Sequence, residues 1–165
     1  MKEIFVNLDR CQGCRSCQLA CAVAHSRSQN LFGALGETPA PRYRLYVERG
    51  LGLNVPLTCR HCDPAPCMEA CIAGALYRDE RGAVRRREGA CVGCWTCLMV
   101  CPYGVVGREK EHKVAVKCDL CPDREVPACV AACPTRALLY REAEGFAAGV
   151  RHHAAEVLAR SKELA

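Results

Sequence analysis

The sequence predicts an α+β chain made of two similar modules, one inserted in the other, with short β-hairpins and short helices around clustered cysteines. Two observations predict this fold. Sixteen of the 165 residues are cysteines, and they fall into four groups of four with short alternating apolar segments between the groups. Aromatic residues make up only 5% of the chain, which is too few for a core of large side chains. Bound metal therefore has to supply part of the stabilisation.

The third cysteine group carries the clearest chemical signal. It has the spacing C-x2-C-x2-C-x3-C and is followed by proline. This run is typical of [4Fe-4S] ligands: three close thiolates bind one cluster, and the more distant fourth binds a neighbouring cluster. A chain with one such group needs another, and this chain has three more. The third group consists of Cys91, Cys94, Cys97 and Cys101.

The first group follows residues 2–8, an alternating stretch that we interpret as a strand. It has the same spacing as the third group, but Ala22 replaces the proline, so we expect a changed turn and an intact cluster. Residues 22–58 form the longest insertion, with a helix over 22–28, a loop over 31–41 and a hairpin over 42–57. This insertion is a scaffold or a docking element, and scaffolding is favoured. The first group consists of Cys11, Cys14, Cys17 and Cys21.

The second group and the third form a complete inner module, residues 57–106. Residues 75–86 between them predict a strand, a turn and a strand. His61 lies between two cysteines of the second group, and we interpret it as a residue behind the ligands or on the surface. The second group consists of Cys59, Cys62, Cys67 and Cys71.

The fourth group completes an outer module, residues 1–21 plus 113–141. A hairpin with strands at 103–106 and 113–116 precedes this group, and a closing strand at 137–140 follows it. The two modules make one four-cluster domain over residues 1–141. Residues 142–165 predict a helical tail that packs on the modules or docks a partner, and packing on the modules is favoured. The fourth group consists of Cys118, Cys121, Cys129 and Cys133.

Exchange of fourth ligands within each module uses all sixteen cysteines and predicts four [4Fe-4S] clusters. Set one is Cys11, Cys14, Cys17 and Cys133; set two is Cys118, Cys121, Cys129 and Cys21; set three is Cys59, Cys62, Cys67 and Cys101; set four is Cys91, Cys94, Cys97 and Cys71.

Other uses of the cysteines fit the sequence less well. Zinc sites need two C-x2-C pairs that close on four ligands, and they do not explain triplets with an exchanged fourth cysteine. The N-terminal residues show no export signal, so we expect a cytoplasmic protein in which disulfides are disfavoured. No stretch is apolar enough to span a membrane. The net charge of +5 falls to roughly −3 with four clusters of about −2 each, which argues against nucleic-acid binding.

Four short stretches give the chain a family resemblance, which covers residues 3–141. They are Ala22–Ser26, Cys59–Asp63, Cys94–Cys97 and Lys117–Arg124. The chain resembles the four-cluster iron–sulphur subunits of dimethyl sulfoxide reductase and formate dehydrogenase, and most of all the iron–sulphur protein associated with carbon monoxide dehydrogenase. Similar subunits serve tungsten aldehyde oxidoreductases. The resemblance implies the same pairing, group one with group four and group two with group three. In other branches of the family a tryptophan replaces a ligand of the third group. Here Trp95 lies between ligands and all four cysteines remain.

The predicted function is electron transfer without catalysis. Clusters with four cysteine ligands each leave no iron open to a substrate. We find no Ser/His/Asp grouping and no phosphate-binding glycine motif, and His25, His112, His152 and His153 are scattered and expected to be exposed. The resemblance implies a catalytic oxidoreductase subunit as one partner and a ferredoxin, flavoprotein or other redox acceptor as the second. Several alternatives stay open. One is a partner from a formate dehydrogenase or hydrogenase complex in place of the others, and another is that the chain is a free-standing ferredoxin or a zinc-binding structural or nucleic-acid-binding protein. Self-association into a longer relay is also open.

Overall fold

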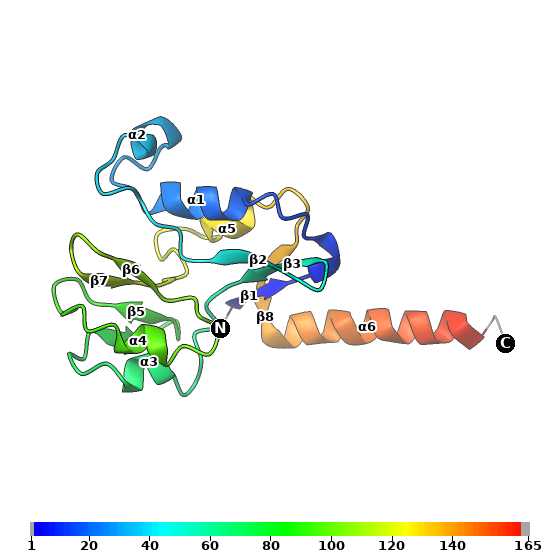
Figure 1. The fold of residues 1–165 in the computed structure, drawn as a ribbon. Helices are drawn as coiled ribbons and strands as arrows, with labels where there is room; N and C mark the ends of the chain where they lie inside the picture. Colours follow the sequence, from blue (N-terminus) through cyan, green and yellow to red (C-terminus); the bar gives the residue numbers. More distant parts are fainter. Residues whose placement is uncertain (1, 163–165) are drawn as a thin grey trace.

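The computed structural model describes residues 2–162, a small α+β fold in which four two-stranded antiparallel sheets alternate with short helices (Figure 1). Each sheet is a separate pair, and three of the four pairs are hairpins between neighbouring strands. The strands are β1 (Lys2–Val6), β2 (Tyr46–Gly50), β3 (Leu53–Leu57), β4 (Leu76–Arg78), β5 (Val84–Arg86), β6 (Gly107–Glu109), β7 (Val114–Val116) and β8 (Leu138–Glu142).

Most helices of the fold are short and begin one residue before a cysteine of the predicted ligand groups. The exceptions are η1, which ends just before Cys11, α2, in the insertion, and α6, at the end of the described chain. The helices are the 3-10 turn η1 (Leu8–Arg10) and α1 (Ser16–Ala24), α2 (Leu31–Leu35), α3 (Pro66–Glu69), α4 (Thr96–Met99), α5 (Ala128–Ala131) and α6 (Ala143–Lys162).

The pairing of β1 with β8 brings the two ends of the chain together (Figure 1). The register places Ile4 opposite Tyr140 and Val6 opposite Leu138. Ile4 and Leu138 are only 3% and 2% exposed, so the pair is held by burial as well as by its hydrogen bonds. The first and fourth cysteine groups are thereby placed on the same side of the molecule, where α1 and α5 pack together.

Two hydrophobic clusters form the core, and cysteines are a large part of both. One cluster surrounds Ile4, Leu45 and Leu120 and includes cysteines of the first and fourth groups. The other surrounds Leu76 and Val84 and includes cysteines of the second and third groups. The core is therefore built around the sites at which metal is expected.

Three predicted segments differ from the structure. The strand expected at 103–106 is wrong: Val105 and Val106 are buried in an irregular segment, and β6 starts at Gly107. The expected loop at 31–41 contains α2, which begins where the Asn30 side chain accepts a hydrogen bond from the Gly33 N–H (2.8 Å). The helix expected over 22–28 begins earlier, at Ser16, and ends at Ala24.

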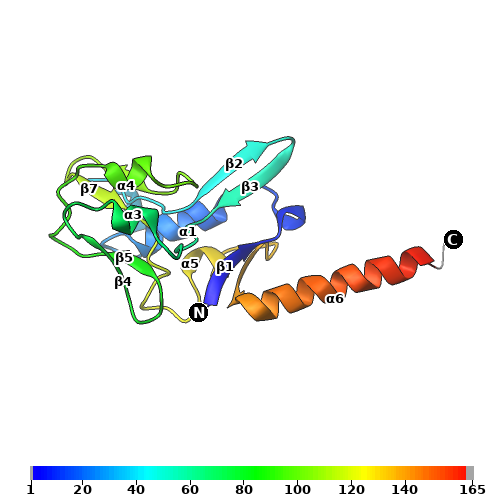
Figure 2. The same cartoon turned by 90° about the horizontal axis from the view of Figure 1, so that it is seen from below.

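Helix α6 extends away from the rest of the molecule (Figure 2). Its first turns contact β1 and β8, where the ring of Phe146 stacks on that of Phe5 with centroids 4.2 Å apart. From residue 148 to 160 the helix is exposed on every side, so it does not pack along the modules as expected. Residues 163–165 of the predicted tail lie outside the described residues. Within the described chain no helix has the length and apolarity that a membrane span requires.

Candidate metal centres

Two small apolar cavities are each lined by four cysteines from different segments. One cavity lies against β5 and the turn before β6 and contains set three. The other lies beside α4 and contains set four. Four sulphur atoms around an apolar cavity are the donor set that an iron–sulphur cluster requires, so the residues present fit this group. The assignment of individual ligands stays a prediction.

The cysteines of sets one and two lie around α1 and α5. Cys17, Cys21 and Cys129 are buried, and other members of the two sets pack against the same core. Burial, with further contributions from the neighbouring Cys14 and Cys133, raises the pKa of Cys17 to about 11. Burial also raises the pKa of Cys129, and Cys118, Cys21 and Cys121 add to this effect. Each of these thiols therefore has members of its own predicted set as neighbours.

Electrostatic coupling between sets gives them a linear order. Cys17 of set one is among the groups that act on Cys129 of set two. Burial raises the pKa of Cys118 in set two to about 12, and the strongest charged neighbour in this effect is Cys59 of set three. Cys67 of set three in turn acts on Cys97 of set four. Contacts give the same order, one, two, three and four: sets one and two share one hydrophobic cluster, sets three and four share the other, and Lys117 binds both Cys118 of set two and Cys59 of set three.

Backbone amides donate hydrogen bonds to sulphur atoms in sets one, two and four. The amides of Ala75 and Ala137 each bind the sulphur of the cysteine four residues earlier, at 3.3 and 3.2 Å. The amides of Arg44 and Ala115 reach sulphur atoms further away in the sequence, those of Cys21 (3.3 Å) and Cys91 (3.4 Å). Such bonds stabilise thiolates and tune the clusters that they hold.

The two outermost sets each present one exposed cysteine. In set one, Ser16 Oγ donates to Cys14 Sγ, and in set four Thr96 Oγ1 donates to Cys94 Sγ, both at 3.5 Å. These side-chain bonds, with those from the Ser16 and Thr96 amides, lower the pKa of both cysteines.

The backbone before these two cysteines is also alike. Gly13 and Gly93 both have positive φ, 71° and 69°, and a Cβ on either would collide with a neighbouring residue. Groups one and three therefore repeat one local geometry, which exposes a thiol at each end of the series.

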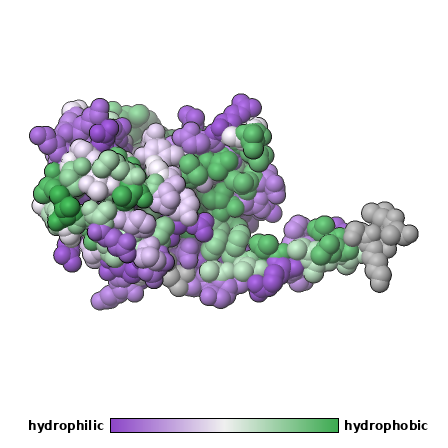
Figure 3. Space-filling view, turned by 60° about the horizontal axis from the view of Figure 1, so that its bottom comes forward, coloured by the Kyte–Doolittle hydropathy of each residue, from purple (hydrophilic) through white to green (hydrophobic). Residues whose placement is uncertain are grey.

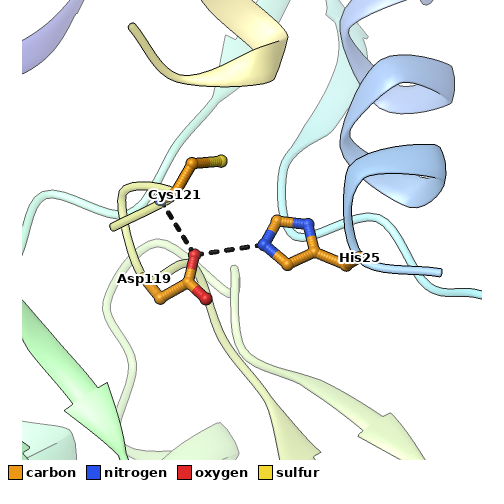
Figure 4. Close-up of side chains that lie close together, drawn as sticks. All are labelled: His25, Asp119 and Cys121. Carbon is orange, nitrogen blue, oxygen red and sulfur yellow. Dashed lines mark hydrogen bonds and ion pairs between the residues drawn. The ribbon is translucent and has the colours of Figure 1, made fainter. Parts of the chain in front are cut away.

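An ion-pair network lies beside set two (Figure 4). The Nε2 atom of His25 is 3.1 Å from Asp119, and Asp119 also forms an ion pair with Arg44. Burial disfavours the charged imidazole, but hydrogen bonds to Asp119, Cys121 and Cys21 outweigh it and raise the pKa of His25 to about 11. The expectation that His25 is exposed is wrong, because its side chain is 13% exposed and closes this network.

The same network could in principle hold a metal ion. Ligand atoms of His25, Asp119 and Cys121 lie within 4.8 Å of one another. Asp119, however, already pairs with His25 and Arg44 and accepts the Cys121 amide at 3.0 Å. We therefore interpret the group as a brace between the insertion and the fourth cysteine group.

Two buried polar residues lie where sets two and three meet. His61 is 4% exposed and its Nδ1 accepts the Val84 amide at 2.9 Å, which places it behind the ligands and not on the surface. Burial, and then the charge of Lys117, lower the pKa of His61 to about 3. Lys117 is 5% exposed and its Nζ donates to Cys59 Sγ at 3.2 Å. No spacing rule marks Lys117, so sequence reasoning missed it.

Comparisons with known proteins point to one kind of protein. The 4Fe-4S dicluster domain family matches residues 52–143. An iron-sulfur protein of Rhodospirillum rubrum is 37% identical over 96% of this chain and 91% of its own length. The electron transport protein HydN of Escherichia coli K12 is 40% identical over 82% of this chain and 85% of its own. The thiosulfate reductase electron transfer subunit PhsB of Salmonella typhi is 35% identical over 79% and 70%.

Proposed function

This chain belongs to the 4Fe-4S dicluster domain family, and we propose that it carries four [4Fe-4S] clusters and relays electrons between a catalytic oxidoreductase subunit and a second redox partner. Like its named relatives, it is an iron–sulphur electron-transfer protein and not a catalyst. The number of clusters, their ligands and the partners are the parts that we propose.

The sorting of sixteen cysteines into four sets of four supports the four clusters. Sets three and four each line one apolar cavity. Cysteines of sets one and two lie in the hydrophobic cluster around Ile4, Leu45 and Leu120. In this cluster, cysteines that are distant in sequence raise one another's pKa. We propose that set one with set two, and set three with set four, exchange their fourth ligands as the spacing predicts. We also propose that the outer module is residues 1–21 plus 113–141 and the inner module residues 57–106.

The order of the sets supports a linear relay. Electrons would enter and leave at sets one and four, because these sets contain the exposed thiols Cys14 and Cys94. Exposed apolar side chains lie near the second of these ends, namely Ile72, Val92 and Met99. Hydrophobic surface is visible on the side of the molecule that carries α3 and α4, at the left of Figure 3. An apolar rim around an exposed cluster suits the transient contacts of electron exchange.

The protein's own residues keep the cluster environment constant during transfer. Amide and hydroxyl donors on the sulphur atoms, together with burial, set the potentials. The clusters supply the electron-accepting iron. With every iron held by a cysteine, the chain offers no position for a substrate.

We propose carbon monoxide dehydrogenase as the first candidate for the catalytic partner, from the resemblance of the four stretches described above. The subunit of a tungsten aldehyde oxidoreductase or of a formate dehydrogenase or hydrogenase complex is the second. The relative that serves thiosulfate reductase supports a partner of the oxidoreductase class without choosing among these. Sixteen cysteines that serve as metal ligands suit a reducing compartment, and we propose the cytoplasm.

Anaerobic purification of the tagged chain from its own cells tests the proposal. We expect a brown protein with about sixteen iron and sixteen sulphide per chain, four of each per cluster, and an oxidoreductase subunit that co-purifies with it. Bleaching of the visible absorbance by carbon monoxide, through the co-purified subunit, would support the first candidate partner. A count near eight would remove half of the ligand sets, and a colourless zinc protein would refute the function.

A further inference from the structure

We propose that the buried side chain of Lys117 raises the reduction potential of the cluster held by set three, through a hydrogen bond to Cys59 and through its positive charge. The inference rests on the proposed four clusters and concerns a potential-setting residue that no cysteine spacing reveals. It assigns a function to the junction between the two modules.

Three hydrogen bonds fix the position of the Lys117 ammonium. Its Nζ donates to Cys59 Sγ at 3.2 Å, to the Val84 carbonyl at 2.6 Å and to the Cys118 carbonyl at 3.1 Å. An ammonium has three donors, so all of them are used. Val84 is fully buried in β5, and Cys118 begins the fourth cysteine group. The ammonium therefore joins the inner hairpin, the second group and the fourth group at one point.

A buried ammonium requires a negative charge nearby, because its desolvation costs several kcal/mol. Carbonyl groups supply dipoles but no net charge. Asp119, an acid on the neighbouring segment, is already paired with Arg44 and His25. His61, which also lies near Lys117, carries no negative charge in either protonation state, and its Nδ1 accepts the Val84 amide. The Cys59 thiolate and the cluster bound to it are thus the charge that compensates Lys117.

The same contact has a consequence for electron transfer. A cluster gains one negative charge when it is reduced, and a fixed positive charge stabilises the reduced form more than the oxidised form. A hydrogen bond to a ligand sulphur acts in the same direction. Lys117 therefore raises the potential of the cluster of set three and favours its reduced form.

The effect is expected to be selective among the four clusters. The ammonium contacts a sulphur of set three, but it reaches set two only through the Cys118 carbonyl. Sets one and four have no ligand among the atoms that Lys117 binds. The shift on removing Lys117 should be largest for set three, smaller for set two and smallest at the two ends.

Redox titration of the intact four-cluster protein, followed by electron paramagnetic resonance, tests this inference with matched variants. Lys117→Met removes both charge and donors, Lys117→Gln keeps a donor, and Lys110→Met removes the same charge from an exposed turn. We expect Lys117→Met to lower one midpoint by at least a tenfold change in the ratio of reduced to oxidised cluster, about 59 mV for one electron. Lys117→Gln should lower it less, and Lys110→Met should leave all four unchanged. Four unchanged midpoints in a Lys117→Met chain with full iron would overturn the inference.

A second measurement covers the case in which the neutral variants lose their clusters. The native protein is labelled with ¹⁵N at lysine side chains, and pulsed electron paramagnetic resonance is used to look for ¹⁵N coupled to a reduced cluster. We expect one such coupling in the native protein and none in Lys117→Arg, in which the labelled nitrogen is absent. No coupling in the native protein would overturn the inference, whereas an iron count near eight would instead overturn the four-cluster function.

Discussion

Asp119 is the acidic residue that ties the long insertion to the fourth cysteine group. It pairs with His25, which caps the end of α1, and with Arg44, which precedes β2. The charged imidazole and guanidinium lower the pKa of Asp119 despite its burial. One carboxylate therefore holds together three segments that are distant in sequence.

We predict that Asp119→Asn destabilises the folded protein by about 2 kcal/mol, because it leaves two partly buried cations without their shared anion. The measurement is the guanidinium concentration at which the visible cluster absorbance and the far-ultraviolet circular dichroism are lost. Asp123→Asn is the control, since Asp123 lies in the same segment but is exposed. Equal midpoints for the two variants would show that the network contributes nothing to stability.

At the scale of elements, cysteine spacing and alternation predicted most of the fold. Short apolar segments that alternate and flank a turn predict hairpins, and the hairpins β2–β3 and β4–β5 lie where expected. The strand predicted at 103–106 is wrong because Val105 and Val106 are buried in an irregular segment, and the sequence pattern cannot distinguish such a segment from a strand. The sequence does not indicate the role of Lys117, and it predicts an exposed His25, since the importance of both residues comes from contacts between distant segments.

An aromatic contact joins the first turns of α6 to the β1–β8 pair. The rings of Phe5 and Phe146 are stacked with an interplanar angle of 9°. We predict that Phe146→Ala lowers the stability of the protein by about 1.5 kcal/mol, through loss of stacking and of apolar burial. Val150→Ala is the control, because Val150 is 52% exposed on the projecting part of the helix. Amide hydrogen exchange in β1 and β8 measures the effect, and unchanged exchange in the Phe146 variant would contradict it.

At the scale of the whole molecule, exchange of fourth ligands predicts which cluster each substitution damages. Cys101 is the last cysteine of the third group, yet it lines the cavity of set three, and Cys71, the last cysteine of the second group, lines that of set four. We therefore predict that Cys101→Ala perturbs the cluster held by Cys59, Cys62 and Cys67, whereas Cys71→Ala perturbs the other inner cluster. The Lys117-dependent midpoint identifies the cluster of set three in redox titrations. Loss of that midpoint in Cys71→Ala and not in Cys101→Ala would show that the ligands are not exchanged.

The clusters also replace the large side chains that the core lacks. Both hydrophobic clusters are completed by cysteines of the predicted ligand sets, and aromatic residues are only 5% of the chain. Each site joins segments that the sequence separates by tens of residues, so metal binding and folding are coupled. We predict that complete removal of iron under anaerobic, reducing conditions unfolds the chain, and that iron with sulphide restores it. Far-ultraviolet circular dichroism measures the change, with a chain carried through the same steps without chelator as the control. A native-like spectrum in fully iron-free protein would show that the hairpins and the β1–β8 pair are stable without the clusters.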